Sequence, residues 1–211
     1  MNEMGTARWY WWEVVALVLF LARCPGCATV HAGWCDGCWT VLVNSPVVYR
    51  SGVLVSHEYA GALRELIVAM KYSSARWVAP MLGELWIARH AHVCDVEAVT
   101  WVPTTRARMR DRGYDQSELI ARRIARRLGV PSTALLRRVD DGAQTGRTAS
   151  ERRDGAHFIA RRSRHARVLL VDDVVTTGAT LRHGCDALRA VGVGTVTCAA
   201  IAATKAPEGR R

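Results

Sequence analysis

The sequence predicts an α/β protein with a mostly parallel sheet, flanking helices and a small cysteine-rich segment near its start. Apolar runs of strand length alternate with amphipathic helical stretches between residues 59 and 201, which is the order that builds parallel sheets. Residues 168–171 are a continuous apolar run, as expected of a strand buried on both faces. A chain of 211 residues is long enough for one such domain and a short appendage.

Composition excludes wholesale disorder and points to anionic partners. Half of the residues are hydrophobic and 23% are charged, so the chain can form a core. Lysine and arginine together number 29 against 19 acidic residues, which gives a net charge of +10. Such an excess attracts anions but does not distinguish nucleic acid from a phosphorylated small molecule.

The most apolar stretch, residues 9–22, is interrupted by Glu13 and is too short to span a bilayer. We predict an amphipathic helix over residues 1–23 that packs on its own protein. A secretory signal is the alternative, but Arg23 precedes Cys24 where processing requires a small residue. A helix lying on a membrane surface is disfavoured because its polar face lacks lysine and arginine. We therefore expect no transmembrane span and a cytoplasmic location.

The segment of residues 24–42 carries two Cys-x-x-Cys pairs. Their members are Cys24, Cys27, Cys35 and Cys38. Four thiolates at this spacing favour one structural Zn²⁺ in a closed tetrahedral site. Two disulfides or an iron–sulfur cluster are the alternatives, and His31 lies between the pairs as a substitute ligand. Three further cysteines are scattered along the chain: Cys94, Cys185 and Cys198. We interpret those three as apolar packing residues.

The remaining elements follow from hydrophobic period and turn residues. Before the apolar run we predict a hairpin of residues 47–50 and 53–57, helices over 59–71 and 77–89, a strand over 98–102, a helix over 115–128, and short strands over 133–136 and 158–160. Residues 140–155 are polar and contain glycine, which predicts a loop. After the apolar run we predict a helix over residues 181–191 and a strand over 195–201.

Directly after the apolar run come Asp172 and Asp173, then a turn rich in hydroxyl groups. The turn consists of Thr176, Thr177, Gly178, Ala179 and Thr180. Ligands of open α/β sheets bind at the carboxyl ends of strands, and adjacent carboxylates are costly there unless a cation or sugar hydroxyls engage them. Backbone N–H groups at a helix start, with three hydroxyl groups and a glycine, suit a phosphate monoester. The lysine of a Walker loop is missing.

This order of four apolar residues, two acidic residues and a Thr-Thr-Gly-x-Thr turn resembles the fingerprint of type I phosphoribosyltransferases. The resemblance implies that Asp172 and Asp173 hold the ribose hydroxyls of phosphoribosyl pyrophosphate (PRPP). It also implies that the turn of residues 176–180 holds the 5′-phosphate.

The rest of the chain resembles the ComF family, also called GntX-type or amidophosphoribosyltransferase-like. The resemblance rests on the double Cys-x-x-Cys segment, Lys71-Tyr72, the Val-Pro…Arg-Gly-Tyr-x-Gln stretch of residues 102–116, and Gln-Thr-Gly at 144–146. It predicts a phosphoribosyltransferase-like domain over residues 43–205, followed by a flexible tail at 206–211. Asp115 is a departure, because the family usually has asparagine there.

The resemblance implies a reaction in which the 5-phosphoribosyl group of Mg²⁺-bound PRPP passes to an unidentified small-molecule acceptor, with release of pyrophosphate. Thr104, Thr105 and Arg106 resemble the family's pyrophosphate loop, with Arg106 as the catalytic candidate and Lys71 as a further ligand contact. Departing pyrophosphate requires cations, and Arg108 is a second candidate, with Arg110 and Arg112 less favoured. Residues 140–155 would act as a hood that excludes water.

Two other functions compete with transfer. The chain could keep the PRPP fold for a binding or regulatory role, or it could bind single-stranded DNA or competence machinery, since ComF relatives are associated with DNA uptake. One helix face carries Arg122, Arg123, Arg126 and Arg127, but such a face is usually solvated. No aromatic residues interleave it, as single-strand stacking would require. Oligomeric state is left open.

Overall fold

The computed structural model describes residues 23–24, 26–31, 34–46, 48–50, 52–73, 75–139 and 156–205. The chain divides into two compact units between Ser45 and Pro46. The helix predicted before Cys24, the hood at residues 140–155 and the tail at 206–211 lie outside the described residues. Within the part of the chain that is described, no helix has both the length and the apolar character needed to cross a membrane.

The smaller unit contains the cysteine-rich segment and helix α2 (Asp36–Asn44). Arg23 and Val30 form an isolated antiparallel bridge that closes the first Cys-x-x-Cys pair into a loop. Cys35 is the N-cap of α2, so the second pair begins at the start of a helix. This helix was not predicted from the sequence.

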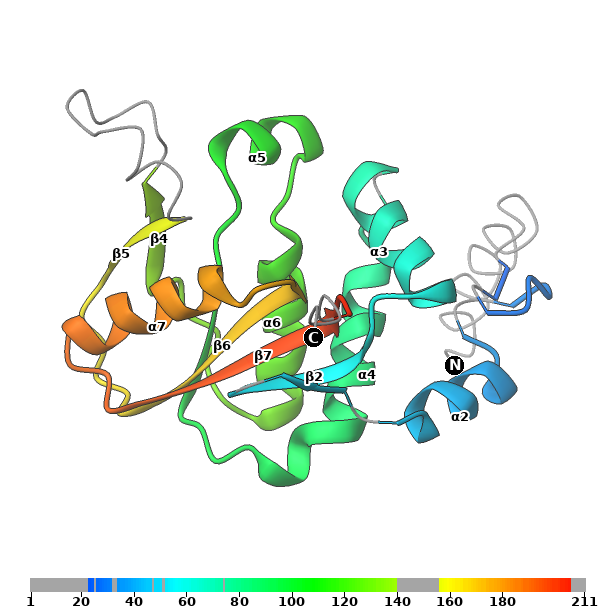
Figure 1. Ribbon diagram of the computed structural model, residues 1–211, viewed down its shortest axis with the longest axis horizontal. Helices are drawn as coiled ribbons and strands as arrows, with labels where there is room; N and C mark the ends of the chain where they lie inside the picture. Colours follow the sequence, from blue (N-terminus) through cyan, green and yellow to red (C-terminus); the bar gives the residue numbers. More distant parts are fainter. Residues whose placement is uncertain are drawn as a thin grey trace, which may run out of the picture. The chain divides into compact units, whose positions relative to one another are not determined.

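The larger unit is built on a five-stranded sheet with the order β1-β2-β7-β6-β3 (Figure 1). The strands are β1 (Val48–Arg50), β2 (Val53–Glu58), β3 (Ala98–Trp101), β6 (Arg167–Val175) and β7 (Thr195–Ala203). Only the β1–β2 pair is antiparallel, and the other three neighbouring pairs are parallel. The predicted mostly parallel sheet and its leading hairpin are therefore confirmed.

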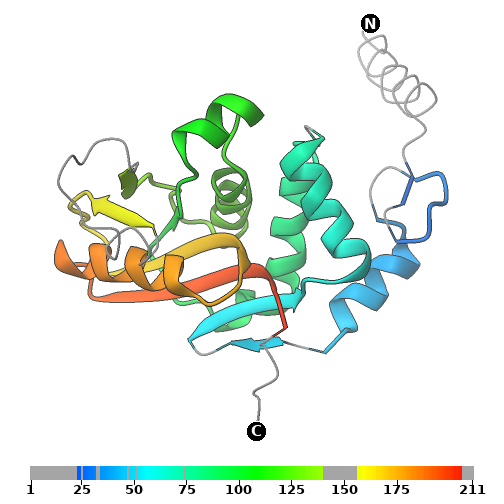
Figure 2. The same ribbon diagram turned by 45° about the horizontal axis from the view of Figure 1, so that its top comes forward.

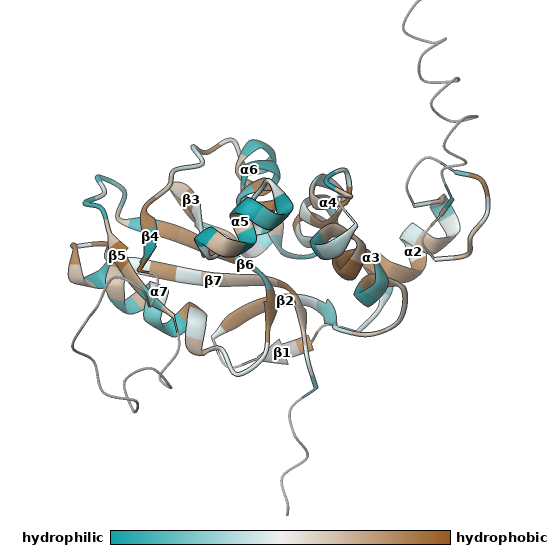
Figure 3. Ribbon diagram, turned by 90° about the horizontal axis from the view of Figure 1, so that it is seen from above, coloured by the Kyte–Doolittle hydropathy of each residue, from teal (hydrophilic) through white to brown (hydrophobic). Residues whose placement is uncertain are grey.

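Helices cover both faces of this sheet (Figure 3). Helices α4 (Val78–His90) and α6 (Gln116–Leu128) pack against each other and on one face, and α3 (Gly61–Tyr72) packs on α4. A 3₁₀ turn, η1 (Ala91–Val93), follows α4. Helix α7 (Ala179–Ala190) runs along β6 and β7 on the opposite face (Figure 2).

Strand β6 forms the centre of the core. Val168 and Leu170 belong to the buried cluster that includes Leu181 and Leu188 of α7. Leu169, which points to the other face because side chains alternate along a strand, is also completely buried. The continuous apolar run thus reflects burial on both faces, as predicted.

Strand β6, helix α7 and strand β4 have other bounds than the sequence predicts. Strand β6 continues to Val175, so Asp172 and Asp173 belong to the strand itself, and the parallel ladder with β7 extends past them. Helix α7 begins at Ala179, two residues earlier than predicted. The strand predicted over residues 133–136 lies instead at β4 (Leu136–Val139), which pairs with β5 (His157–Ala160) as a separate antiparallel hairpin next to α7.

An additional helix, α5 (Arg106–Arg112), lies between the predicted strand over 98–102 and the predicted helix over 115–128. Thr105 is its N-cap, and the Thr105 hydroxyl accepts the N–H of Arg108 at 3.2 Å. Gly113 ends the helix with φ of +76°, a conformation that favours glycine. None of its residues is buried, and it is coloured as hydrophilic in Figure 3, so hydrophobic period gave no signal for it.

Close packing of α4 on α6 yields a first test. A Cβ atom at Gly83 would lie 2.8 Å from Cβ of Arg123 and 3.3 Å from the backbone oxygen of Ile120. We expect Gly83→Ala to lower the free energy of unfolding by about 1–2 kcal/mol, because overpacking outweighs alanine's better helix propensity. Chemical denaturation measures this. Ala88→Ser, at an exposed position of the same helix, should stay within about 0.5 kcal/mol; equal effects of the two changes would refute the packing argument.

Candidate functional site

A cavity of about 380 Å³ lies at the carboxyl ends of β3 and β6. Acidic, basic and hydroxyl side chains dominate its wall. These include Lys71, Thr104, Arg108, Arg112, Gln116, Ser117, Arg138, Asp172, Asp173, Thr176 and Thr180. Such a position beyond strand ends is where open α/β sheets bind their ligands.

The structure brings together many of the site residues predicted from the sequence, but not all. Those that line this cavity are Lys71, Thr104, Asp172, Asp173, Thr176 and Thr180. Thr177 and Gly178 line a neighbouring cavity of about 570 Å³. Thr105, Arg106 and Ala179 line neither cavity.

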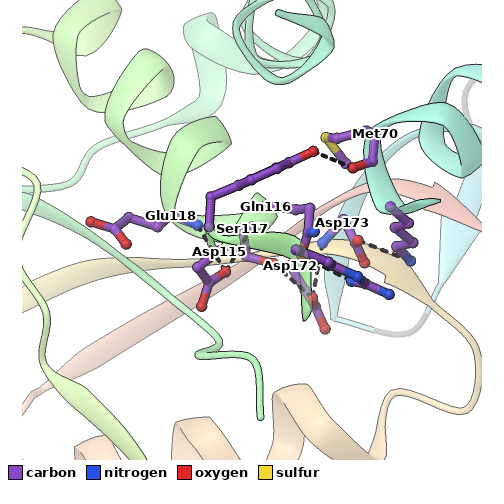
Figure 4. Close-up of polar contacts among 10 residues, drawn as sticks. Met70, Asp115, Gln116, Ser117, Glu118, Asp172 and Asp173 are labelled. Atoms are coloured by element: carbon purple, nitrogen blue, oxygen red, sulfur yellow. Dashed lines mark hydrogen bonds and ion pairs between the residues drawn. The ribbon is translucent and has the colours of Figure 1, made fainter. Parts of the chain in front are cut away.

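The acidic pair is held by contacts from two helices (Figure 4). The Lys71 ammonium at the end of α3 lies 2.9 Å from Oδ2 of Asp173. The Ser117 hydroxyl donates to Oδ1 of Asp172 at 3.2 Å, and the N–H of Asp173 donates to the same oxygen at 2.9 Å. The carboxylates are therefore fixed before any ligand arrives.

Burial and the adjacent Asp173 carboxylate raise the pKa of Asp172 to about 7. The hydrogen bonds from Asp173 N–H and Ser117, together with the charge of Lys71, act in the opposite direction. A cation or hydroxyl donors bound to a carboxylate with a raised pKa would stabilise its ionised form. Perturbed acids of this kind concentrate at functional sites.

Asp115 connects the loop after β3 to the start of α6. Its Oδ2 accepts the N–H of Thr104 at 2.8 Å, and its Oδ1 accepts the N–H groups of Ser117 and Glu118 at 3.0 and 3.3 Å. Burial nevertheless raises the pKa of Asp115 to about 6. The Asp-x-x-Glu pattern is a helix-start signal, but the Thr104 contact could not be predicted from it.

Arg112 and Gln116 form a polar edge of the cavity. This pairing was not predicted from the sequence. Arg112 Nη1 donates to Gln116 Oε1 at 3.1 Å, and the Arg112 guanidinium lies 5.1 Å from the ring centre of Tyr72. Gln116 is 2% exposed, and its Nε2 has no partner among the described residues. A buried donor without a partner is costly and is available to a ligand.

The Tyr114 hydroxyl, next to this edge, donates a hydrogen bond to the backbone oxygen of Met70. Met70 directly precedes Lys71 in α3. The segment between α5 and α6 is therefore tied to the backbone that carries the lysine.

The hydroxyl-rich turn after β6 has the geometry of a helix start. Gly178 is the N-cap of α7 with φ of +77°, so a side chain there would strain the backbone. The Thr177 hydroxyl accepts the N–H of Ala179 at 3.3 Å, and Arg182 Nη1 donates to the Thr177 backbone oxygen at 2.9 Å. The turn thus presents N–H groups and hydroxyls together, an arrangement that suits anions.

In the smaller unit the four cysteines of the double Cys-x-x-Cys segment come together. Their sulfur atoms all lie within 4.8 Å of one another, and Sγ of Cys27 is 3.6 Å from Sγ of Cys35. A Cβ atom at Gly26 would lie 2.6 Å from Sγ of Cys38, so the backbone passes very close to the cluster. Tetrahedral thiolate ligands at about 2.3 Å from a metal stand about 3.8 Å apart, which fits this group.

Backbone N–H groups around the cluster stabilise the ionised form of the Cys24 thiol. Cys35 N–H lies 3.4 Å from Sγ of Cys24. Burial of Cys24 acts against ionisation, but backbone N–H groups of Cys35, Cys27 and Gly26 outweigh it and lower the pKa of the Cys24 thiol to about 6. The cluster could therefore bind a metal ion. His31 is exposed and is not part of it.

Comparison with known proteins places the chain in a family. It is 30% identical over 184 residues to competence protein F of Haemophilus influenzae, covering 81% of this chain and 80% of that protein. The chain belongs to the competence protein F (ComF) family. Residues 115–211 also match the family described as phosphoribosyl transferase domain. The domain match, together with the observed sheet and helices, confirms the predicted phosphoribosyltransferase fold in this ComF-family chain.

Some solved structures are similar to this chain at lower sequence identity. The glutamine PRPP amidotransferase from B. subtilis is 23% identical with a TM-score of 0.41, over 61% of this chain and 26% of that one. An adenine phosphoribosyltransferase from Leishmania donovani is 16% identical with a TM-score of 0.42, over 75% of each chain. The ComF-family chain thus spans about a quarter of the amidotransferase.

The raised pKa of Asp172 predicts a pH effect on stability. Its pKa rises from 3.8 to about 7 on folding, so the folded state binds the proton more tightly and the free energy of unfolding falls as pH rises through this range. Asn can keep both hydrogen bonds to Oδ1 without the charge. We expect Asp172→Asn to raise the free energy of unfolding at pH 8 by roughly 2–4 kcal/mol, with little change at pH 4.

Chemical denaturation of the ligand-free protein across pH 4 to pH 8 measures this effect. Asp95→Asn is the matched control, because the Asp95 side chain is 86% exposed and should leave the profile unchanged. A parallel pH profile for wild type and Asp172→Asn would contradict an energetically costly Asp172 carboxylate in the folded protein.

Proposed function

We propose that this chain binds Mg²⁺-PRPP in the 380 Å³ cavity and transfers its 5-phosphoribosyl group to a small-molecule acceptor, releasing pyrophosphate. The observation that carries the proposal is the position of the acidic pair. Asp172 and Asp173 share one cavity with Lys71, Thr104 and Thr176 at the carboxyl edge of a parallel sheet. The phosphoribosyl transferase domain match supports the same ligand class.

In this proposal the carboxylates of Asp172 and Asp173 accept hydrogen bonds from the two ribose hydroxyls. Hydroxyl donors would engage the ionised acids without introducing another negative charge, which lowers the cost of keeping the pair buried. The turn of residues 176–180 holds the 5′-phosphate with its N–H groups and hydroxyls. Since β6 and the turn belong to one continuous segment, the backbone sets the spacing between the groups proposed for the ribose hydroxyls and those proposed for the phosphate.

The leaving pyrophosphate would lie against the opposite wall, where Arg108, Arg112 and Thr104 line the cavity. Arg106 was the candidate from the sequence, but it does not line this cavity, so we propose Arg108 and Arg112 for this role. Fixed positive groups stabilise the charge that develops on the departing oxygen. Bond breakage before acceptor attack would give the ribose carbon oxocarbenium character, as in other glycosyl transfers.

The donor set of the cavity also fits the metal that accompanies PRPP. Two carboxylates and several hydroxyls offer oxygen ligands of the kind that Mg²⁺ prefers. When bound, Mg²⁺ would neutralise part of the pyrophosphate charge. Lys71 meanwhile holds the Asp173 carboxylate in place through a contact of 2.9 Å.

Calorimetry with Mg²⁺-PRPP tests the binding step. We expect micromolar binding by the wild type and at least a tenfold weaker affinity for Asp172→Asn, because Asn donates where the ribose hydroxyl needs an acceptor. Asp95→Asn should bind as the wild type does. Equal affinity of Asp172→Asn and the wild type for Mg²⁺-PRPP would show that the acidic pair does not bind this ligand.

Transfer is tested separately by pyrophosphate release with a panel of nucleobases and amines. Release that depends on one acceptor supports a transferase. Binding of PRPP without release for any member of the panel would favour a binding or regulatory protein that keeps this fold.

We also propose that the four-cysteine cluster holds one structural Zn²⁺. Four thiolates leave no open coordination position, so the site stabilises the fold of its segment rather than performing chemistry. Reduced thiolates agree with a cytoplasmic location, which we propose on this ground. Elemental analysis should find one zinc per chain, lost in Cys24→Ser and kept in Cys94→Ser. Iron at the same ratio, or no metal, would refute zinc.

The arginine face of α6 gives little support to a nucleic-acid-binding function. Arg122 lies 2.5 Å from Glu118, Arg123 lies 2.5 Å from Glu84, and Arg127 lies 3.4 Å from the same Glu84 carboxylate. These pairs use the charge that phosphates would need. We therefore keep phosphoribosyl transfer as the proposed function.

A further inference from the structure

Two buried cysteines outside the proposed sites face each other across the interface of α7 and β7. Sγ of Cys185 lies 3.0 Å from Sγ of Cys198, and the two residues are 6% and 8% exposed. From the sequence alone, both are expected to be apolar packing residues. At this separation the sulfurs need to approach by only about 1 Å to reach the length of a disulfide bond.

Small solutes have a route to this pair. Cys185 and Cys198 both line the 570 Å³ cavity, together with Thr177, Gly178 and Arg189. The thiols are therefore shielded from large reagents by their burial, while a molecule of the size of hydrogen peroxide fits the space beside them.

The two thiols differ in the direction in which their pKa is shifted. The hydrogen bond with Cys198 lowers the pKa of the Cys185 thiol, burial opposes this, and the charge of Arg189 assists it. The same contact, reinforced by burial, raises the pKa of Cys198. Cys185 is thus the better thiolate, and thiolates are the form that peroxides oxidise. A protonated neighbour in contact is well placed to resolve the first product.

We propose that Cys185 and Cys198 are a peroxide-responsive thiol pair whose oxidation forms a disulfide between α7 and β7. In the first step the Cys185 thiolate attacks one peroxide oxygen, the O–O bond breaks, and the product is a sulfenic acid and, after protonation, water. In the second step Cys198 sulfur attacks the sulfenic sulfur, an S–S bond forms, and a second water leaves. The two thiols together lose two electrons and two protons, and one peroxide is reduced to two waters.

Peptide mapping tests the proposal on the full-length protein. Trypsin cleaves after Arg182, Arg189 and Lys205, so Cys185 and Cys198 fall in separate peptides, residues 183–189 and 190–205. After brief treatment of the folded protein with hydrogen peroxide and blocking of remaining thiols, we expect these two peptides to be recovered linked. Their joint mass should be lower than the sum of the reduced peptides by two hydrogens, and dithiothreitol should separate them.

Two variants and one internal control sharpen the result. Cys198→Ser lacks the resolving thiol, so Cys185 should accumulate as a sulfenic acid that dimedone labels, whereas Cys185→Ser should give neither link nor label at Cys198. Cys94 is the control, because burial raises its pKa to about 11 and it should remain reduced. Recovery of peptides 183–189 and 190–205 unlinked, or oxidation of Cys94 at the same rate as Cys185, would overturn the proposal.

Discussion

Two neighbouring carboxylates, Asp173 buried and Asp172 partly buried, near the end of a parallel strand are the constraint on which the site depends. Taking charged groups out of water costs several kcal/mol for each, and β6 places Asp172 and Asp173 next to each other. The fold offsets this cost from outside the strand: Lys71 of α3 binds Asp173, and Ser117 of α6 donates to Asp172. The helices on that face are therefore positioned by charge as well as by their apolar packing.

Asp115 extends the same arrangement to the other side of the cavity. It holds the N–H of Thr104, so the loop after β3 is fixed to the helix whose next residues support Asp172. Asparagine at this position could not accept all three N–H groups in this geometry, because its amide nitrogen would face at least one of them. The aspartate accepts all three, and these bonds lower its pKa, whereas its burial raises the pKa more strongly.

The fold was predictable from the sequence where its signal is local. The apolar run of residues 168–171, the acidic pair and the hydroxyl-rich turn lie in one segment, and their order predicted the buried strand, which the structure confirms, and the ligand class that we propose. Helix α5 was missed because no residue of it is buried, so it has no hydrophobic period to detect. Among so many arginines, sequence spacing also could not show that Arg112, rather than Arg106, lines the cavity, because this depends on how α5 leaves the sheet.

The hydrogen bond from Tyr114 to the Met70 backbone has a consequence for protein engineering and for divergence within the family. This bond ties the end of α3 to the connection between α5 and α6, although more than forty positions separate the two residues. A shift of one segment is therefore expected to shift the other. Transplanting either piece alone into a related scaffold would displace the lysine by moving the backbone on which it stands. Swaps that exchange both pieces together should preserve the spacing between ammonium and carboxylate.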